Sequence, residues 1–65
     1  MFEQGKVNML NQLVRNYYND NYHAEYINSF YGKAWYILVA ENPPTFLSKS
    51  LDGAIETMQF VNNNC

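Results

Sequence analysis

The chain has 65 residues, a formal net charge of -2 at pH 7, and 48% hydrophobic and 17% aromatic residues. This length supports one small domain, residues 1–65, near the lower limit of independent folding, and the apolar content excludes a disordered chain. Its four Lys and Arg residues are scattered along the sequence, so it lacks the basic stripe that is typical of nucleic-acid-binding domains.

A first helix is predicted over residues 5–19. Val7, Leu10, Val14 and Tyr17 recur at helical spacing, and amide and arginine side chains occupy the opposite side. The run of asparagine and aspartate at residues 19–21 should end this helix, because these side chains compete for backbone hydrogen bonds and favour turns.

Two strands are expected next, over residues 22–30 and 34–41. The first alternates apolar and polar residues, and the second begins with seven consecutive apolar residues rich in aromatic and β-branched types. We expect the connecting turn at Tyr31 and Gly32, because glycine adopts a positive φ without strain. The strongly apolar second strand should therefore lie at the centre of the sheet.

Pro43 and Pro44 are expected to end the second strand. Proline has no backbone N–H group to donate to a sheet, so it interrupts a ladder of hydrogen bonds. The apolar and hydroxyl residues 45–48 are then predicted to form a short third strand.

A second helix is predicted to begin after Ser50. Serine is a favoured N-cap residue, and Asp52 in the first turn complements the helix dipole. The apolar stripe of this helix consists of Leu51, Ala54, Ile55, Met58 and Val61.

This order of elements predicts the α+β class: a three-stranded antiparallel sheet with N- and C-terminal helices (α-β-β-β-α), both packed on one face. In the expected register Tyr26 lies opposite Ile37 and Ala24 opposite Val39, on the face that the helices cover. The predicted core consists of Leu10, Val14, Trp35, Ile37, Val39, Ile55 and Met58.

The opposite sheet face is the predicted partner-binding site. Ile27, Tyr36 and Leu38 would form its apolar centre, with His23 and Glu25 at its edge. Monomers rarely expose such a patch without a use. His23 and Glu25 could orient a general base, but no nucleophile accompanies them in the sequence, and no second histidine suggests a metal site. We therefore expect neither an enzyme nor a metal or other cofactor.

The favoured function is a small protein-binding module, with another protein or a second copy of the chain as its partner. Tyrosine-rich surfaces suit protein interfaces, because the side chain has an apolar body and a polar tip. The compact, acidic, tyrosine- and asparagine-rich composition is similar to that of small phage-encoded inhibitors of host defence or transcription, which implies steric occlusion of a host protein. We expect a cytoplasmic protein without a membrane segment, because Cys65 is the sole cysteine and no apolar run is long enough.

Two families supply an alternative function. The predicted order of elements, with residues 10–17 as first helix, resembles the double-stranded RNA-binding domain. That family places several lysines at the start of its second helix, whereas only Lys49 precedes Ser50 here. Residues 34–61, including Pro44 and Phe46, resemble the strand-to-helix half of HicB-type antitoxins. These resemblances imply a nucleic-acid-binding or regulatory domain.

Overall fold

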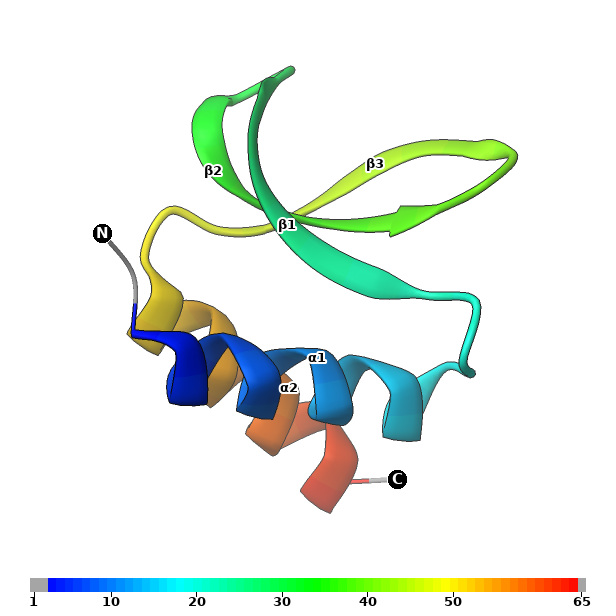
Figure 1. Cartoon of the computed structure of the whole chain (residues 1–65), viewed down its shortest axis with the longest axis vertical. Coiled ribbons are helices and arrows are strands. Elements are labelled where there is room, and N and C mark those ends of the chain that lie inside the picture. The colour runs from blue at the N-terminus through cyan, green and yellow to red at the C-terminus, as the bar shows by residue number, and fades with distance from the viewer. Residues whose placement is uncertain (1–2, 65) are drawn as a thin grey trace.

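Two helices lie beneath a curled three-stranded sheet (Figure 1). The computed structural model describes residues 3–64. Its elements are α1 (Gln4–Tyr17), β1 (His23–Ser29), β2 (Gly32–Val39), β3 (Asn42–Ser48) and α2 (Leu51–Asn63). The sheet has the order β1-β2-β3 and both of its strand pairs are antiparallel. This confirms the predicted α-β-β-β-α fold. Within residues 3–64, neither helix combines the length and apolar character that crossing a membrane requires.

The ends of both helices follow from local side-chain chemistry. The Asn19 side chain accepts a hydrogen bond from the Asn21 backbone N–H group at 2.8 Å, which turns the chain out of α1. At the start of α2, Ser50 Oγ accepts from the Gly53 N–H group at 3.0 Å, as the sequence predicts for an N-cap. The predicted turn after α1 and the predicted N-cap of α2 are therefore both present in the structure.

The β1–β2 hairpin differs from the predicted register by two residues. Its turn lies at Phe30 and Tyr31, so that Tyr26 pairs with Trp35 and Ala24 with Ile37. Gly32 follows the turn with a φ of 86°, a value that residues with side chains rarely adopt. Because side chains alternate with period two, a shift of two residues changes every partner but leaves each residue on its predicted face.

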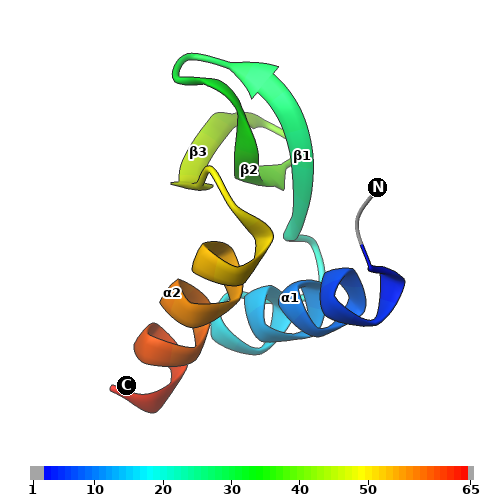
Figure 2. The same ribbon diagram turned by 90° about the vertical axis from the view of Figure 1, so that its left-hand side faces the viewer.

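The prediction that the two prolines end a strand is wrong. Pro43 and Pro44 lie inside β3, which begins at Asn42, and the chain reverses at Ala40 and Glu41 instead. An edge strand accommodates one of these prolines, because alternate N–H groups point away from the sheet and have no ladder partner, and the other is tolerated where the pairing with β2 shifts register between Ile37 and Val39. The β2–β3 pairing also contains two register shifts. Such irregularities bend a strand and increase its twist, and the sheet bends accordingly (Figure 2).

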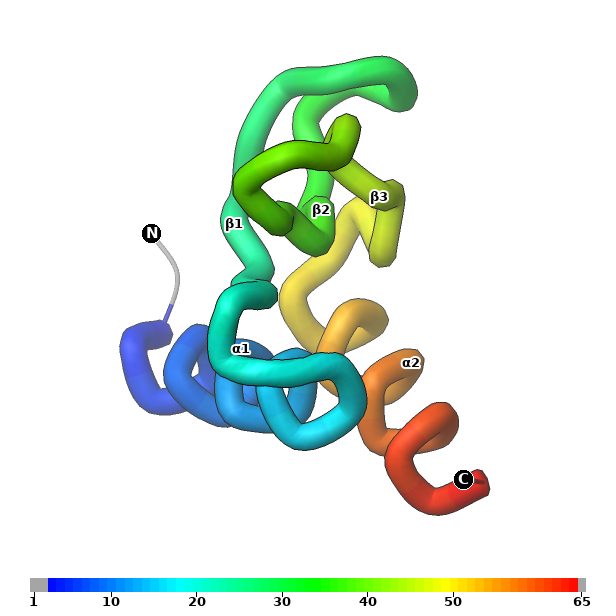
Figure 3. Tube along the Cα trace, turned by 90° about the vertical axis from the view of Figure 1, so that its right-hand side faces the viewer, coloured from blue at the N-terminus to red at the C-terminus, as the bar shows by residue number. Residues whose placement is uncertain are grey.

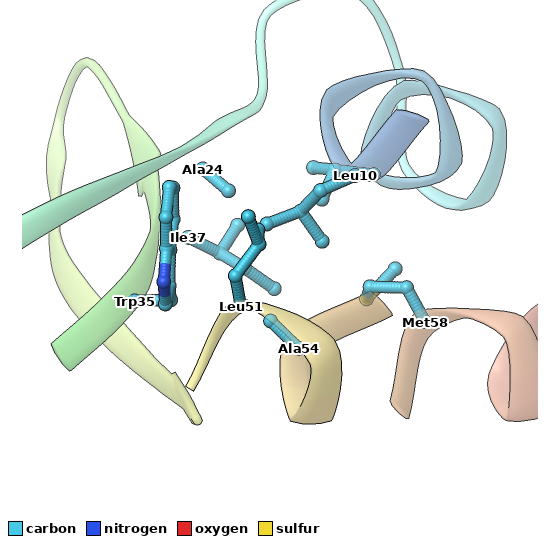
Figure 4. Packing of buried hydrophobic residues seen from close by; sticks show 8 residues of the cluster. Leu10, Ala24, Trp35, Ile37, Leu51, Ala54 and Met58 are labelled. Atoms are coloured by element: carbon cyan, nitrogen blue, oxygen red, sulfur yellow. The ribbon is translucent and has the colours of Figure 1, made fainter. Parts of the chain in front are cut away.

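The core lies between the two helices and the sheet face that carries Trp35 and Ile37. Figure 4 shows its side chains converging from α1, α2 and the strands. Of the predicted core, Ile55 is only partly buried against this cluster, and Val39 is half-buried and outside it. The buried cluster comprises Leu10, Val14, Ala24, Trp35, Ile37, Leu51, Ala54 and Met58.

Candidate protein-binding surface

The sheet face that points away from the helices is called the outer face here. Alternation along the strands assigns it His23, Glu25 and Ile27 of β1, Ala34, Tyr36 and Leu38 of β2, and Phe46 of β3. The five predicted site residues are therefore all on this face. Glu25 pairs with Tyr36, His23 with Leu38, and Ile27 with Ala34.

The outer face differs from the predicted exposed apolar centre at Tyr36. The side chain of this residue is 0% exposed. The curled sheet and its aromatic neighbours cover it. The ring of Phe46 packs edge-on against Tyr36, with ring centres 5.7 Å apart. Ile27 and Leu38 are half-buried, so the centre of the outer face is largely closed by this chain's own residues.

The hydroxyl group of Tyr36 forms hydrogen bonds to the backbone of the β1–β2 turn. It accepts a hydrogen bond from the Tyr31 N–H group at 3.0 Å and donates one to the Gly32 carbonyl at 2.8 Å. Both backbone groups belong to the turn or its first flanking residue. The buried tyrosine therefore anchors the turn to the middle of β2.

His23 and Glu25 lie at the edge of the outer face and contact each other. The imidazole Nε2 and the carboxylate Oε2 are 2.5 Å apart, within hydrogen-bonding distance. Within residues 3–64, no group of three His, Cys, Asp or Glu side chains could hold a metal ion. The pair supplies a polar border to the outer face.

The most exposed aromatic side chains of the β1–β2 hairpin lie in its turn and are not among the predicted site residues. Phe30 is 77% exposed and Tyr31 is 65% exposed, and the Tyr31 ring packs on Phe46 with centres 5.2 Å apart. We call Phe30, Tyr31 and Phe46 the aromatic tip. The exposure of Phe30 and Tyr31 could have been predicted from two adjacent aromatic residues directly before the turn glycine. A tight turn cannot direct both of these side chains into the core.

Most carboxylates lie away from the aromatic tip. The β2–β3 turn, which holds Glu41, is at the other end of β2, on the order of 25 Å along the strand.

Asp52 accepts a hydrogen bond from Lys6 at 3.0 Å and joins the first turns of the two helices. This bond and the negative charge of Asp52 raise the pKa of Lys6 above its usual 10.5.

A polar hollow of about 500 Å³ runs along α1 and offers a second surface. Its amide side chains include Asn11, which is already engaged in the fold. Asn11 Oδ1 accepts from the Ala24 N–H group at 2.8 Å, and its Nδ2 donates to the Val7 carbonyl at 3.1 Å. Asn11 therefore connects α1 to β1, and the hollow lacks the apolar centre that is typical of ligand pockets.

Comparisons of the chain with protein-family models, with curated proteins and with solved structures find no match.

Proposed function

We propose that the protein is a non-enzymatic protein-binding module whose contact surface is the aromatic tip and the adjoining outer face. The observation that carries this proposal is the 77% and 65% exposure of the adjacent Phe30 and Tyr31. Aromatic side chains are enriched at protein interfaces, where they bury a large area at low cost in conformational entropy.

The backbone beneath the aromatic tip is held in place before any partner arrives. Tyr36 bonds both the Tyr31 N–H group and the Gly32 carbonyl, and Phe46 supports the Tyr31 ring from β3. Binding then costs less ordering entropy than it would on a mobile turn. This organisation distinguishes Tyr31 from an isolated exposed aromatic residue such as Phe60 on α2, which is 67% exposed.

The proposed mode of action is occlusion. A module that covers a surface of another protein excludes every other ligand of that surface, so it can inhibit without catalysis. Pro43 and Pro44 in β3 disfavour the addition of a strand at that edge, because neither can donate to the new ladder. Contact through side chains of the aromatic tip is the mode that the described surface favours.

The test compares three tagged proteins as bait in an extract of the cells that express the chain: wild type, the double variant Phe30→Ser/Tyr31→Ser, and Phe60→Ser. Phe60→Ser is the matched control, because it removes a similarly exposed ring from α2. We expect wild type and the control to retain the same protein, as identified by mass spectrometry, and the double variant to lose it. Capture of the same proteins by all three baits would contradict a role for the aromatic tip.

A further inference from the structure

We propose that the partner of the aromatic tip presents an apolar cleft, into which the end of the β1–β2 hairpin inserts so that both faces of the hairpin are in contact. This inference rests on the proposed function and names the shape and chemistry of the partner for that same surface. The projection of the hairpin, its exposed area and the charge of Lys33 support it.

The end of the β1–β2 hairpin projects from the fold. Its turn is at the end of the molecule opposite the C-terminal end of α2, and both helices lie beneath the other end of the sheet (Figures 1 and 3). Beside the turn, Asn28 and Lys33 pair with each other and are exposed on the side that faces the helices further along the strands. The Tyr31 ring packs on Phe46 at the outer face. The hairpin end is therefore accessible to a partner from two opposite sides.

Contact on one side alone supplies too little area for a stable interface. A buried aromatic side chain covers about 200 Å², so the exposed parts of Phe30, Tyr31 and Phe46 amount to roughly 350 Å². A specific interface buries about 800 Å² on each partner. A flat partner touches only the end of a projecting hairpin, whereas the walls of a cleft also cover the side that carries Asn28 and Lys33. The area requirement therefore favours a concave partner.

The residues at the end of the hairpin indicate the chemistry of the cleft. Phe30 and Tyr31 are uncharged aromatic residues in the turn, so the floor of the cleft should be apolar. The Lys33 ammonium group, two residues after Tyr31, has no ion-pair partner among the described residues. A carboxylate at the rim of the cleft would accept a hydrogen bond from it, which agrees with the apolar centre and polar rim of protein interfaces.

The backbone of the hairpin end is already ordered for insertion. Tyr36 Oη holds the Tyr31 N–H group and the Gly32 carbonyl, so the turn keeps one conformation. Protruding loops of single-domain antibodies insert into concave surfaces, and an ordered projection does so at lower cost in entropy. An inserted hairpin fills the cleft, and a small module can thereby exclude the ligands of a larger protein.

Substitutions on the helix side of the hairpin test whether the partner contacts both faces. The protein that the extract experiment identifies, retained by wild type and lost with Phe30→Ser/Tyr31→Ser, is purified and titrated calorimetrically with wild type, Asn28→Trp, Lys33→Glu and Gln12→Trp. Gln12→Trp is the matched control, because it adds the same ring to an exposed amide position on α1. Circular dichroism should show one fold for all four proteins, since the substituted residues are exposed.

Asn28→Trp should raise Kd at least about 10-fold, because the wall of a fitted cleft leaves no room for an added ring. Lys33→Glu should raise it by a similar factor of about 10 through repulsion from the rim carboxylate, and Gln12→Trp should match wild type. Equal affinity of Asn28→Trp and Gln12→Trp would show contact on one side only, which overturns the cleft and leaves the protein-binding function standing. Unchanged affinity of Lys33→Glu would overturn the acidic rim. An extract in which no protein depends on the aromatic tip contradicts both proposals.

Discussion

Tyr36 and Tyr31 are linked by a hydrogen bond between a buried side chain and an exposed turn. Tyr36 Oη accepts the Tyr31 backbone N–H group at 3.0 Å, although the Tyr36 side chain is 0% exposed and the Tyr31 side chain is 65% exposed. The most buried tyrosine of the sheet therefore determines where one of its most exposed aromatic residues is presented. The stability of the hairpin and the proposed contact surface therefore depend on the same residue.

Tyr36→Phe should lower the free energy of unfolding by about 1–3 kcal/mol, because it leaves the Tyr31 N–H group and the Gly32 carbonyl without their partner. Urea denaturation measures this change, and hydrogen exchange of the Tyr31 amide should accelerate. Tyr18→Phe is the control, since it removes the hydroxyl of an exposed tyrosine and should change stability by less than about 0.5 kcal/mol. Equal stability of Tyr36→Phe and Tyr18→Phe would contradict the anchoring role.

Ile37→Ala should cost about 2–5 kcal/mol, because it opens a cavity in the cluster between sheet and helices. That loss is a large fraction of the total stability of so small a domain. Ile55→Ala should cost less, since Ile55 is only partly buried against the same cluster. Thermal unfolding followed by circular dichroism measures both. A larger loss for Ile55→Ala would show that the core is centred on α2.

Gly53→Ala should fail to stabilise α2, although alanine has the better helix propensity by about 1 kcal/mol. A Cβ atom at this position would lie 2.5 Å from Ser48 Oγ and 2.8 Å from Ser50 Oγ, the N-cap acceptor. The clash predicts a net loss of stability in urea denaturation. Adding Ser48→Ala should recover part of that loss, and a strictly additive double variant would exclude the contact with Ser48 as the cause.

Lys6→Met should have a small effect on stability that depends on salt and pH, because the bond from Lys6 to Asp52 is exposed. The pKa of Lys6 is raised in the folded state above 10.5. The stabilisation is therefore fully present below pH 10.5 and is lost as the pH rises through the raised pKa. The difference in Tm between wild type and Lys6→Met should be constant from neutral pH up to that range and vanish above it. A difference that persists at high pH would contradict the ionic origin.

The chain should bind duplex RNA and DNA weakly. Its four cations lie on different parts of the fold, with Lys6 and Arg15 on α1, Lys33 on β2 and Lys49 before α2. They can neutralise few phosphates together, so little affinity arises from counterion release. Fluorescence anisotropy with labelled duplexes at about 150 mM salt checks this. Sub-micromolar binding that is lost in Lys49→Ala would favour the alternative nucleic-acid-binding function.

The sequence determined the type and order of all five elements and the face on which the paired residues of β1 and β2 lie. The helical stripes, the Ser50 cap and the alternation in β1 are local patterns that one segment carries by itself. Even a hairpin register that was wrong by two residues kept Ala24, Tyr26 and Ile37 on the helix side, because the pleat repeats every two residues.

Only the tertiary structure decided how the second face of β2 is covered. The edge position of β3 and its register shift between Ile37 and Val39 together allow Pro43 and Pro44 to remain in a strand, and no local pattern encodes either feature. The register shifts between β2 and β3 bend the sheet, so that Phe46 reaches Tyr36 and Tyr31 from a segment ten or more residues away. Curvature arises from pairing between strands, which is why Tyr36 could be assigned to the outer face from sequence but its burial could not be predicted.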